Sequence, residues 1–299
     1  MKQISCVLAF VMLTGCGGAG AVTQFDGDSA LGYVRQQLAF GPRVPNTPAH
    51  RQTGDWILAQ LRRAADSTEV QAFDHVTTSG DTLRLRNFIG RFRPTEPARV
   101  VLLAHWDTRP RADQSANLGA QRTPIPGAND GASGVAVLLG VADVLARVPP
   151  SVGVDLVFVD GEDYGDFSGP DVLLGSRYYA ATLDADRLPL YAVVFDMVGD
   201  ADLEIPQEPN SVSAAPEVVN RVWSTARDLG YGRVFRDRMG GPITDDHIPL
   251  IQAGVRAIDL IDFSYGPGNA YWHTLEDTLD KVSAGSLKVV GDVAVALVQ

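Results

Sequence analysis

The sequence predicts an α/β fold with a mixed, mostly parallel sheet. Short apolar runs of the kind found in buried strands alternate with longer stretches of helical spacing along most of the chain. Acidic residues and histidines gather directly after those apolar runs, where open α/β sheets bind their ligands. With 299 residues, 45% of them hydrophobic, the chain can bury one sizeable core, and we expect a single domain over residues 28–299.

The first folded elements are two predicted helices followed by two strands. Ala30–Phe40 and Pro48–Ala65 have apolar residues at helical spacing, and the loop Gly41–Thr47 between them is rich in Gly and Pro. Val70–Asp74 and Thr82–Phe92 alternate in a way that is typical of antiparallel strands. This pair is why we expect a mixed sheet.

The rest of the chain alternates buried strands with helices. Short apolar runs indicate the strands Val100–Ala104, Val154–Val159, Ala192–Phe195 and Ala257–Ile261. Helical spacing indicates the helices Ser133–Ala146, Gly175–Leu183, Ala215–Leu229, Asp246–Ala253 and Ala284–Val298. We expect the polar, Pro-bounded stretch Arg109–Pro126 to be a loop near the mouth of the crevice, where it can select substrates.

The N-terminus has the pattern of a bacterial lipoprotein export signal. Lys2 precedes the apolar run Val7–Leu13, and Leu13-Thr14-Gly15-Cys16 matches a lipoprotein cleavage box. We therefore expect residues 1–15 to be a signal peptide, Cys16 to carry a lipid, and residues 16–27 to form a tether. A plain secretory signal in which Cys16 is incidental is the alternative. The pattern predicts an exported, membrane-anchored protein of the bacterial cell envelope.

Charge and cysteine content exclude several classes of function. The formal net charge of -11 opposes contact with nucleic acids, because phosphate backbones need clustered Lys and Arg. Cys6 and Cys16 are the only cysteines, so the folded part has no internal disulfide and no thiolate metal site. A bound metal must therefore have nitrogen and oxygen ligands.

Five stretches, each at the end of a predicted strand or in the loop after it, carry the candidate chemistry. They are Ala104–Thr108, Ala128–Gly134, Asp160–Gly165, Val194–Gly199 and Trp272–Thr274. They supply His105, Asp107, Asp130, Glu162, Asp163, Asp196 and His273. Imidazole and carboxylate groups are zinc ligands, and a catalytic zinc keeps one position open for water or substrate.

Each of these residues alone also has a purely structural explanation. His105 can be a core histidine paired with a nearby acid, and Asp130 can be an ordinary helix cap. Glu162 and Asp163 can form a solvated acidic turn, and His273 can belong to an aromatic-rich corner of the core. All of these explanations would have to hold at once on separate strand ends, so we favour one shared zinc site.

Eight stretches together carry a resemblance to a known family. In chain order they are FGPRVPNTPAH (Phe40–His50), RNFIG (Arg86–Gly90), LLAHWDT (Leu102–Thr108), NDGASGVAVLL (Asn129–Leu139), FVDGEDYG (Phe158–Gly165), GSRYYA (Gly175–Ala180), DDHIPLI (Asp245–Ile251) and WHTLEDT (Trp272–Thr278). The set resembles the M28 zinc peptidase superfamily and, within it, the glutaminyl-peptide cyclotransferases of animal type. The resemblance implies a three-layer αβα sandwich with a central mixed, mostly parallel sheet, as in zinc aminopeptidases.

The resemblance also implies roles for single residues. In the superfamily the metal ligands match His105, Asp130, Asp163, Asp196 and His273. The cyclotransferases bind a single zinc through three of these, which are Asp130, Asp163 and His273. The remaining roles match Glu162 as general base, Asp196 and Asp245 as hydrogen-bonding groups around the substrate, and Trp272 as pocket wall. The family usually has two glutamates where this chain has Glu162-Asp163, and the shorter acid still offers an oxygen ligand.

We therefore expect a zinc-dependent glutaminyl-peptide cyclotransferase, which converts the N-terminal glutamine of a peptide or protein to pyroglutamate and releases ammonia. One zinc ion is expected, and two are allowed because all five ligands of the two-metal peptidases are present. The alternative is a two-zinc M28 aminopeptidase with His105 and Asp196 on the second ion. A non-catalytic, lipid-anchored binding protein ranks third, because a pure binder has no use for Glu162 beside the metal.

Two further residues are expected to support the site. Asp107 is expected to accept a hydrogen bond from the ring of the neighbouring HWD histidine and so to orient it. His247 is expected to support Asp245, or else only to start a helix after the capping acids. His50 and His75 lie far from the strand-end motifs, and we assign them no role.

Overall fold

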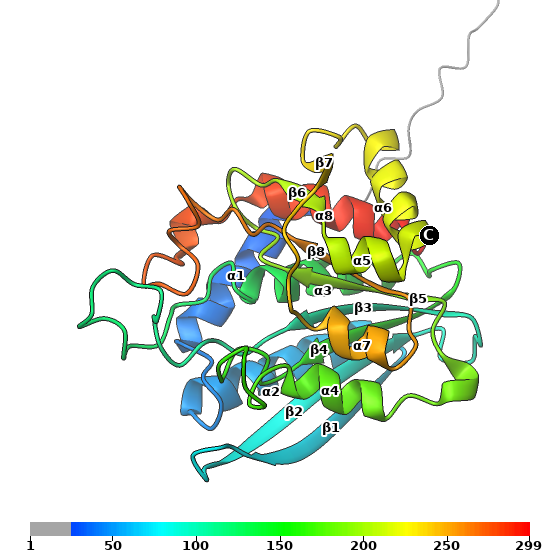
Figure 1. Ribbon diagram of the computed structural model, residues 1–299. Helices are drawn as coiled ribbons and strands as arrows, with labels where there is room; N and C mark the ends of the chain where they lie inside the picture. Colours follow the sequence, from blue (N-terminus) through cyan, green and yellow to red (C-terminus); the bar gives the residue numbers. More distant parts are fainter. Residues whose placement is uncertain (1–24) are drawn as a thin grey trace, which may run out of the picture.

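The computed structural model describes residues 25–299, which form three layers with a sheet in the middle and helices on both of its faces (Figure 1). The strands of this sheet are β1 (Ser67–Val76), β2 (Thr82–Phe92), β3 (Arg99–His105), β4 (Gly153–Val159), β5 (Tyr191–Asp196) and β8 (Ala257–Ile261). They lie in the order β1-β2-β4-β3-β5-β8. The three-layer αβα sandwich with a mixed, mostly parallel sheet is thus confirmed.

Within this sheet, β2 is the strand that runs against its neighbours. It pairs antiparallel with β1 from Thr82 to Arg91 and with β4, where Phe88 lies opposite Phe158. By contrast, β4, β3, β5 and β8 run parallel to one another. The carboxyl ends of these four strands therefore meet at one edge of the sheet, where α/β proteins place their sites.

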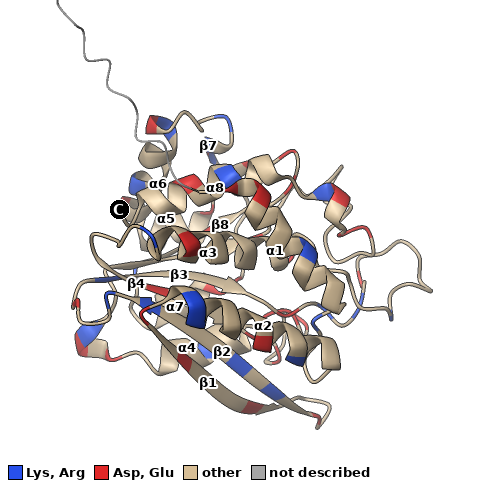
Figure 2. Cartoon of the chain, turned by 180° about the vertical axis from the view of Figure 1, so that it is seen from behind, with Lys and Arg blue, Asp and Glu red and all other residues tan. Residues whose placement is uncertain are grey.

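Helices cover both faces of the sheet. One face carries α1 (Gly27–Phe40), α2 (Pro48–Ala64), α3 (Ala132–Leu145) and α8 (Ala284–Ala296). The other face carries α4 (Leu174–Ala181) and α7 (His247–Gln252). Beside β8 lie α5 (Pro209–Ala214), α6 (Pro216–Asp228) and a small parallel pair of strands, β6 (Ile205–Gln207) and β7 (Phe235–Met239). In Figure 2, Lys and Arg are interspersed with Asp and Glu over the outer helices, as on solvated faces, whereas β2 carries arginines and no acidic residue.

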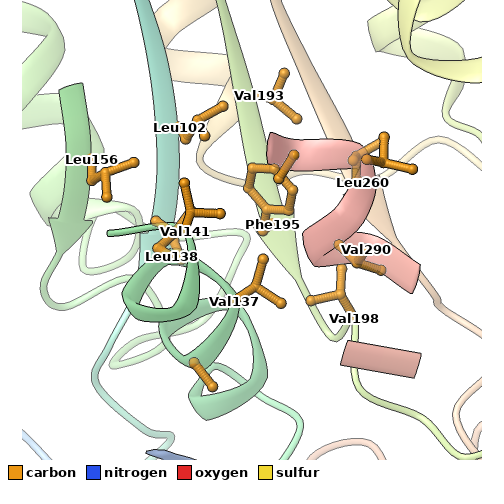
Figure 3. Close-up of a cluster of buried hydrophobic side chains, with 14 of the residues drawn as sticks. Leu102, Val137, Leu138, Val141, Leu156, Val193, Phe195, Val198, Leu260 and Val290 are labelled. Carbon is orange, nitrogen blue, oxygen red and sulfur yellow. The ribbon is translucent and has the colours of Figure 1, made fainter. Parts of the chain in front are cut away.

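The larger core lies between the sheet and α3. Side chains of three neighbouring strands, among them Leu102 and Val193, face Leu138 and Val141 of α3 (Figure 3). Nearly every residue of α3 is buried, which explains why its sequence is apolar all round. Each fully buried Leu or Val contributes about 1.5–3 kcal/mol. This packing fixes α3, and with it the turn that leads into the helix, against the strand ends.

The folded body begins earlier than the sequence indicates. Residues 16–27 are expected to form a tether, yet Phe25 is only 3% exposed and α1 already starts at Gly27. The ring of Phe25 lies against Gly140 of α3 and Gly291 of α8, where an added Cβ atom would collide with it. The expected signal peptide and Cys16 lie outside the described residues. Within residues 25–299, no helix is long and apolar enough to cross a bilayer.

The other expected elements agree with the structure to within three residues, whereas α5, β6 and β7 are not among the expected elements. The helix expected over Ala215–Leu229 begins at Pro216, and the separate helix α5 ends just before it. Proline cannot continue a helix, because it lacks an N–H and clashes with the preceding turn, but it fits the first helical position. The strands β6 and β7 are not predicted, because one has three residues and the other is rich in charged residues.

Glu208 connects the start of α5 to the segment before α7 through hydrogen bonds. Its carboxylate accepts hydrogen bonds from the N–H groups of Asn210 and Ser211 at the start of α5, and from the N–H of Ile243 at 3.1 Å. Burial by itself raises the pKa of Glu208, but contacts with His247, Asn210 and Ser211 outweigh it and lower the pKa to about 2. The ionised carboxylate is therefore the form that stabilises the fold.

We expect Glu208→Gln to lower the free energy of unfolding at pH 7 by about 1–3 kcal/mol, because charge-assisted hydrogen bonds are lost. Since the folded pKa lies below the ordinary value of 4.5, the difference from wild type is full above about pH 4.5 and shrinks as the pH falls towards 2. Denaturant unfolding at pH 7 and pH 3 measures it, with Glu217→Gln as the exposed control. A difference that stayed constant between the two pH values would contradict this account.

Candidate metal centre and pocket

Three neighbouring parallel strands bring acids and a histidine to one edge of the sheet. β3 ends at His105, β5 ends at Asp196, and Glu162 and Asp163 follow the end of β4. These side chains are buried, with residue exposures between 0% and 9%. The strand-end motifs therefore lie together at one edge of the sheet, as the sequence predicts.

Two groups of ligand-type residues meet at Asp130. In the first, His273 Nε2 lies 3.4 Å from Asp130 Oδ2 and 3.2 Å from Asp163 Oδ1. In the second, His105 Nε2 lies 3.2 Å from Asp130 Oδ1 and 3.1 Å from Asp196 Oδ1. The ligand atoms of each group all lie within 4.8 Å of one another. The arrangement has the form of a one-ion or two-ion site that shares Asp130.

The chemistry of the first group fits a zinc ion. Asp163 Oδ2 is buried and has no hydrogen-bond partner. A buried carboxylate oxygen in that state is costly unless a cation lies beside it. Zinc takes imidazole nitrogen and carboxylate oxygen, which are the donors that Asp130, Asp163 and His273 offer.

Burial and mutual contacts decide the ionisation of these groups. For His105, burial lowers the pKa, but contacts with Asp107, Asp130 and Asp196 outweigh it and raise the pKa well above its ordinary value. Burial raises the pKa of Asp196 to about 7, although His105 opposes the shift. Burial also favours the neutral form of Asp130, but contacts with His105 and His273 outweigh it and lower its pKa. Asp130, which both groups share, is thus held ionised.

Glu162 is the candidate general base. It is 5% exposed and lines the pocket described below. Burial raises its pKa well above the ordinary value, His105 opposes the shift, and Asp163, Asp245 and Asp246 add to it. A carboxyl group with raised proton affinity is suited to take up and return a proton near neutral pH.

Asp107 supports the acidic pair through the backbone. Its two oxygens accept hydrogen bonds from the N–H groups of Glu162 at 3.0 Å and Asp163 at 3.2 Å. The distance from His105 Nδ1 to Asp107 Oδ1 is 3.6 Å, and this nitrogen has no hydrogen-bond partner. Asp107 therefore orients the loop after β4 by direct hydrogen bonds and touches the histidine ring only at longer range.

Asp130 does not act as a helix cap. The helix α3 is capped at Gly131 without a side-chain hydrogen bond, and the Asp130 carboxylate lies between the two histidines instead. A Cβ atom at position 131 would collide with the ring of His105. Glycine is needed there because the backbone and the imidazole approach so closely.

Two residues that the sequence does not single out hold the Asp130 turn from both sides. The buried guanidinium of Arg43 donates to the carbonyl oxygens of Gly127 at 2.7 Å and Asp130 at 3.4 Å. Asp277 accepts from the N–H groups of Asn129 at 2.8 Å and Asp130 at 3.2 Å. Both lie in stretches that carry the family resemblance, FGPRVPNTPAH and WHTLEDT, and this is the sequence signal by which they could have been found.

A pocket of about 240 Å³ opens above the two groups. Its wall contains Trp272, whose ring stacks on His273 with centroids 3.9 Å apart, and Phe263, which packs edge-on against Trp272. Its lining residues are Asp130, Glu162, Phe167, Asp196, Pro242, Ile243, Thr244, Asp245, Ile261, Phe263, Trp272 and His273. The lining thus combines carboxylates with aromatic and aliphatic side chains.

His247 is the first residue of α7 and lies behind the pocket. Its ring nitrogens lie 3.3 Å from Glu208 Oε2 and 3.9 Å from Asp259 Oδ2. Ligand-type atoms of Asp245, His247 and Asp259 lie within 4.8 Å of one another. The structure therefore brings His247 close to Asp245, together with Asp259 and Glu208, which the sequence does not single out.

His50 and His75 are separate from the groups around Asp130. His50 Nε2 contacts Asp160 Oδ1 at 2.8 Å, and its ring stacks on Trp106. His75 Nε2 contacts Asp171 Oδ1 at 2.7 Å. Each forms a pair with one carboxylate that ties neighbouring segments together.

We expect zinc to raise the melting temperature of the metal-free protein, because an ion that binds only the folded state stabilises it by about 2.7 kcal/mol at a free concentration of 100 times the Kd. Asp130→Asn keeps the shape of the side chain but removes the shared charge, so the zinc-dependent rise should disappear. Thermal unfolding with and without added zinc measures both, with Asp171→Asn as the control. Equal stabilisation of Asp130→Asn and wild type would rule out this site.

Comparison with known proteins finds similar proteins that are named as aminopeptidase, Zn-dependent exopeptidase and glutaminyl cyclase. It is 29% identical to aminopeptidase YwaD of Bacillus subtilis over 94% of this chain, and it spans 57% of the length of that relative. A Zn-dependent exopeptidase from Parabacteroides distasonis superposes with a TM-score of 0.88 at 38% identity, covering 93% of this chain and 99% of that one.

A glutaminyl cyclase from Bacteroides thetaiotaomicron superposes with a TM-score of 0.87 at 37% identity, covering 92% of this chain and 98% of that one. The resemblance drawn from the sequence motifs is thereby confirmed, with aminopeptidases and glutaminyl cyclases both among the relatives. The model of peptidase family M28 matches residues 87–298. This chain therefore belongs to peptidase family M28.

Proposed function

We propose that the protein is a glutaminyl-peptide cyclotransferase that uses zinc to convert an N-terminal glutamine to pyroglutamate with release of ammonia. The observation that carries this proposal is the small pocket, whose lining combines Trp272 and Phe263 with the acids Glu162, Asp196 and Asp245. A space of about 240 Å³ suits one folded residue rather than an extended peptide. Similarity to a solved glutaminyl cyclase supports the same reaction.

The acids in the pocket have distinct parts in this reaction. A zinc ion held by Asp130, Asp163 and His273 would supply Lewis acidity toward the side-chain amide oxygen of the glutamine. Glu162 accepts a proton from the α-amine as its nitrogen bonds to the amide carbon, and it returns that proton to the departing nitrogen as the C–N bond breaks. The leaving group is ammonia, so atoms and charges balance. Asp196 and Asp245 line the same pocket and accept hydrogen bonds from the substrate nitrogens.

The apolar wall favours cyclisation over hydrolysis. Nucleophile and electrophile belong to the same residue, so the pocket has to hold the glutamine in a folded conformation and keep water away. Trp272 and Phe263, packed edge-on, present a rigid aromatic surface for that purpose. Stacking between Trp272 and His273 also fixes the position of the aromatic wall relative to the first group of ligand residues.

A two-zinc aminopeptidase is the second candidate, and one observation favours it. His105, Asp130 and Asp196 form a complete second ligand group beside the first. In that case a metal-activated water would attack the first peptide bond, and Glu162 would take its proton. A binding protein without catalysis ranks third, because the buried base would then serve no purpose.

We also propose where the enzyme acts. Residues 1–15 would direct export, and Cys16 would carry the lipid that holds the enzyme at a membrane of the bacterial cell envelope. The substrates would be N-termini of peptides or proteins, and nucleic acids would not be partners because the chain is acidic.

Incubation of the zinc-loaded protein with a Gln-initiated peptide should give a product lighter by the mass of one ammonia, as measured by mass spectrometry. Glu162→Gln should lower kcat by about 10²–10⁴-fold, because the proton acceptor is removed. Chelation of the metal should abolish the reaction, and zinc should restore it.

An Ala-initiated peptide of otherwise identical sequence is the matched substrate control, and it should remain intact. Release of free glutamine or alanine, leaving a shortened peptide, would reject the cyclotransferase and support the aminopeptidase. Zinc binding with neither product would support the binding protein.

A further inference from the structure

The loop Arg109–Pro126 contributes no residue to the lining of the pocket, and it begins against Asp163 of the first group instead. The side chain of Arg109 is 6% exposed. Its Nη1 atom donates to Asp163 Oδ1 at 2.8 Å and to the carbonyl oxygen of Gly165 at 2.9 Å. One of the three residues in the first group, Asp163, is therefore held by a guanidinium from this loop.

The same guanidinium holds a second carboxylate. Arg109 Nε and Nη2 donate to the two oxygens of Asp113 at 2.9 and 2.6 Å, which is the bidentate geometry that arginine favours. Asp113 Oδ1 lies 3.6 Å from Nδ1 of His273, and the N–H of Gln114 donates to the carbonyl oxygen of His273. A continuous path of contacts thus runs from Asp163 through Arg109 and Asp113 to His273.

This path contacts both ligands from outside the first group. Nε2 of His273 faces Asp130 and Asp163, while Nδ1 faces Asp113 at 3.6 Å without a hydrogen bond. A carboxylate near the non-ligating nitrogen favours the tautomer with the proton on that nitrogen. The guanidinium binds Asp163 Oδ1 and leaves Oδ2 without a hydrogen-bond partner and therefore available to a metal.

The two groups differ, among the described residues, in how their carboxylate ligands are held. The histidines are alike, since His105 Nδ1 has Asp107 at 3.6 Å, His273 Nδ1 has Asp113 at 3.6 Å, and neither nitrogen has a hydrogen-bond partner. The ion-pair contact of Asp196 is with His105 itself, and no arginine contacts it. The first group is therefore the one in which a guanidinium holds a carboxylate ligand.

We propose that Arg109 and Asp113, the Arg109–Asp113 clamp, are positioning residues that hold Asp163 and His273 in their ligating orientations and thereby set the zinc affinity of the first group. The inference rests on the zinc site of the proposed function, but it does not depend on which reaction that site catalyses. Lysine cannot replace Arg109, because a single ammonium cannot bind two carboxylates in a bidentate fork.

The test is the zinc Kd of the full-length protein, measured by competition with a fluorescent chelator. Arg109→Met and Asp113→Ala should each weaken zinc binding by about 10–100-fold, as loss of partners behind metal ligands does. Asp113→Asn keeps an oxygen acceptor for the His273 ring and should lie between Asp113→Ala and wild type. Arg122→Met removes the same charge from an exposed position of the same loop and should bind zinc like wild type.

A spectroscopic measurement separates positioning from a general loss of stability. The visible absorption spectrum of the Co²⁺-substituted protein reports ligand geometry, so it should change in Arg109→Met and Asp113→Ala and remain unchanged in Arg122→Met. If Asp113→Ala fails to fold, Asp113→Asn and Arg109→Met decide the question.

The clamp would be overturned if Arg109→Met and Asp113→Ala bound zinc with the Kd of the wild type. It would also be overturned if Arg122→Met lost zinc affinity to the same extent as they do. Wild-type protein that bound no zinc would overturn the clamp together with the metal site. If wild type bound zinc, the clamp variants bound it more weakly, and no Gln-initiated peptide was cyclised, the proposed reaction alone would fail.

Discussion

The arrangement of this protein depends on negative charge buried at the carboxyl edge of the sheet. Asp130, Asp163, Asp196 and Glu162 lie together with little access to water. Carboxylates in such surroundings cannot all stay ionised unless positive charge lies beside them. The chain supplies part of it through histidines and Arg109, and the ligand geometry leaves room for a metal ion to supply more. Most features of the site follow from this requirement.

A second constraint is that buried backbone groups near the site must also be paired. At the turn before α3, Arg43 donates hydrogen bonds to carbonyl oxygens and Asp277 accepts them from N–H groups, so both kinds of backbone group in the turn are paired. Tyr265 donates in turn to Asp277 at 2.8 Å. The position of the Asp130 carboxylate is therefore set by the paired backbone that carries it, and the close packing of α3 keeps that backbone in place.

The sequence predicts the layers and the strand ends because both leave local patterns. Apolar runs mark β3, β4, β5 and β8, and acids and histidines directly after them predict the crevice. It does not predict the contacts of Arg43 and Asp277 with the Asp130 turn or of Asp113 with His273, since these join distant segments. The N-terminal boundary of the fold is missed for the same reason: Phe25 lies in a short segment without periodicity, and its glycine neighbours are more than a hundred residues away.

The position of Phe25 also bears on how the chain reaches its native state. Its ring packs against α8, the last helix of the chain, as well as against α3. The N-terminal end of the core therefore cannot close while the chain is still being made, because α8, against which Phe25 packs, does not yet exist. Folding of this body is completed only when the whole chain is present, and a shortened chain without α8 would leave an aromatic side chain and the apolar face of α3 uncovered.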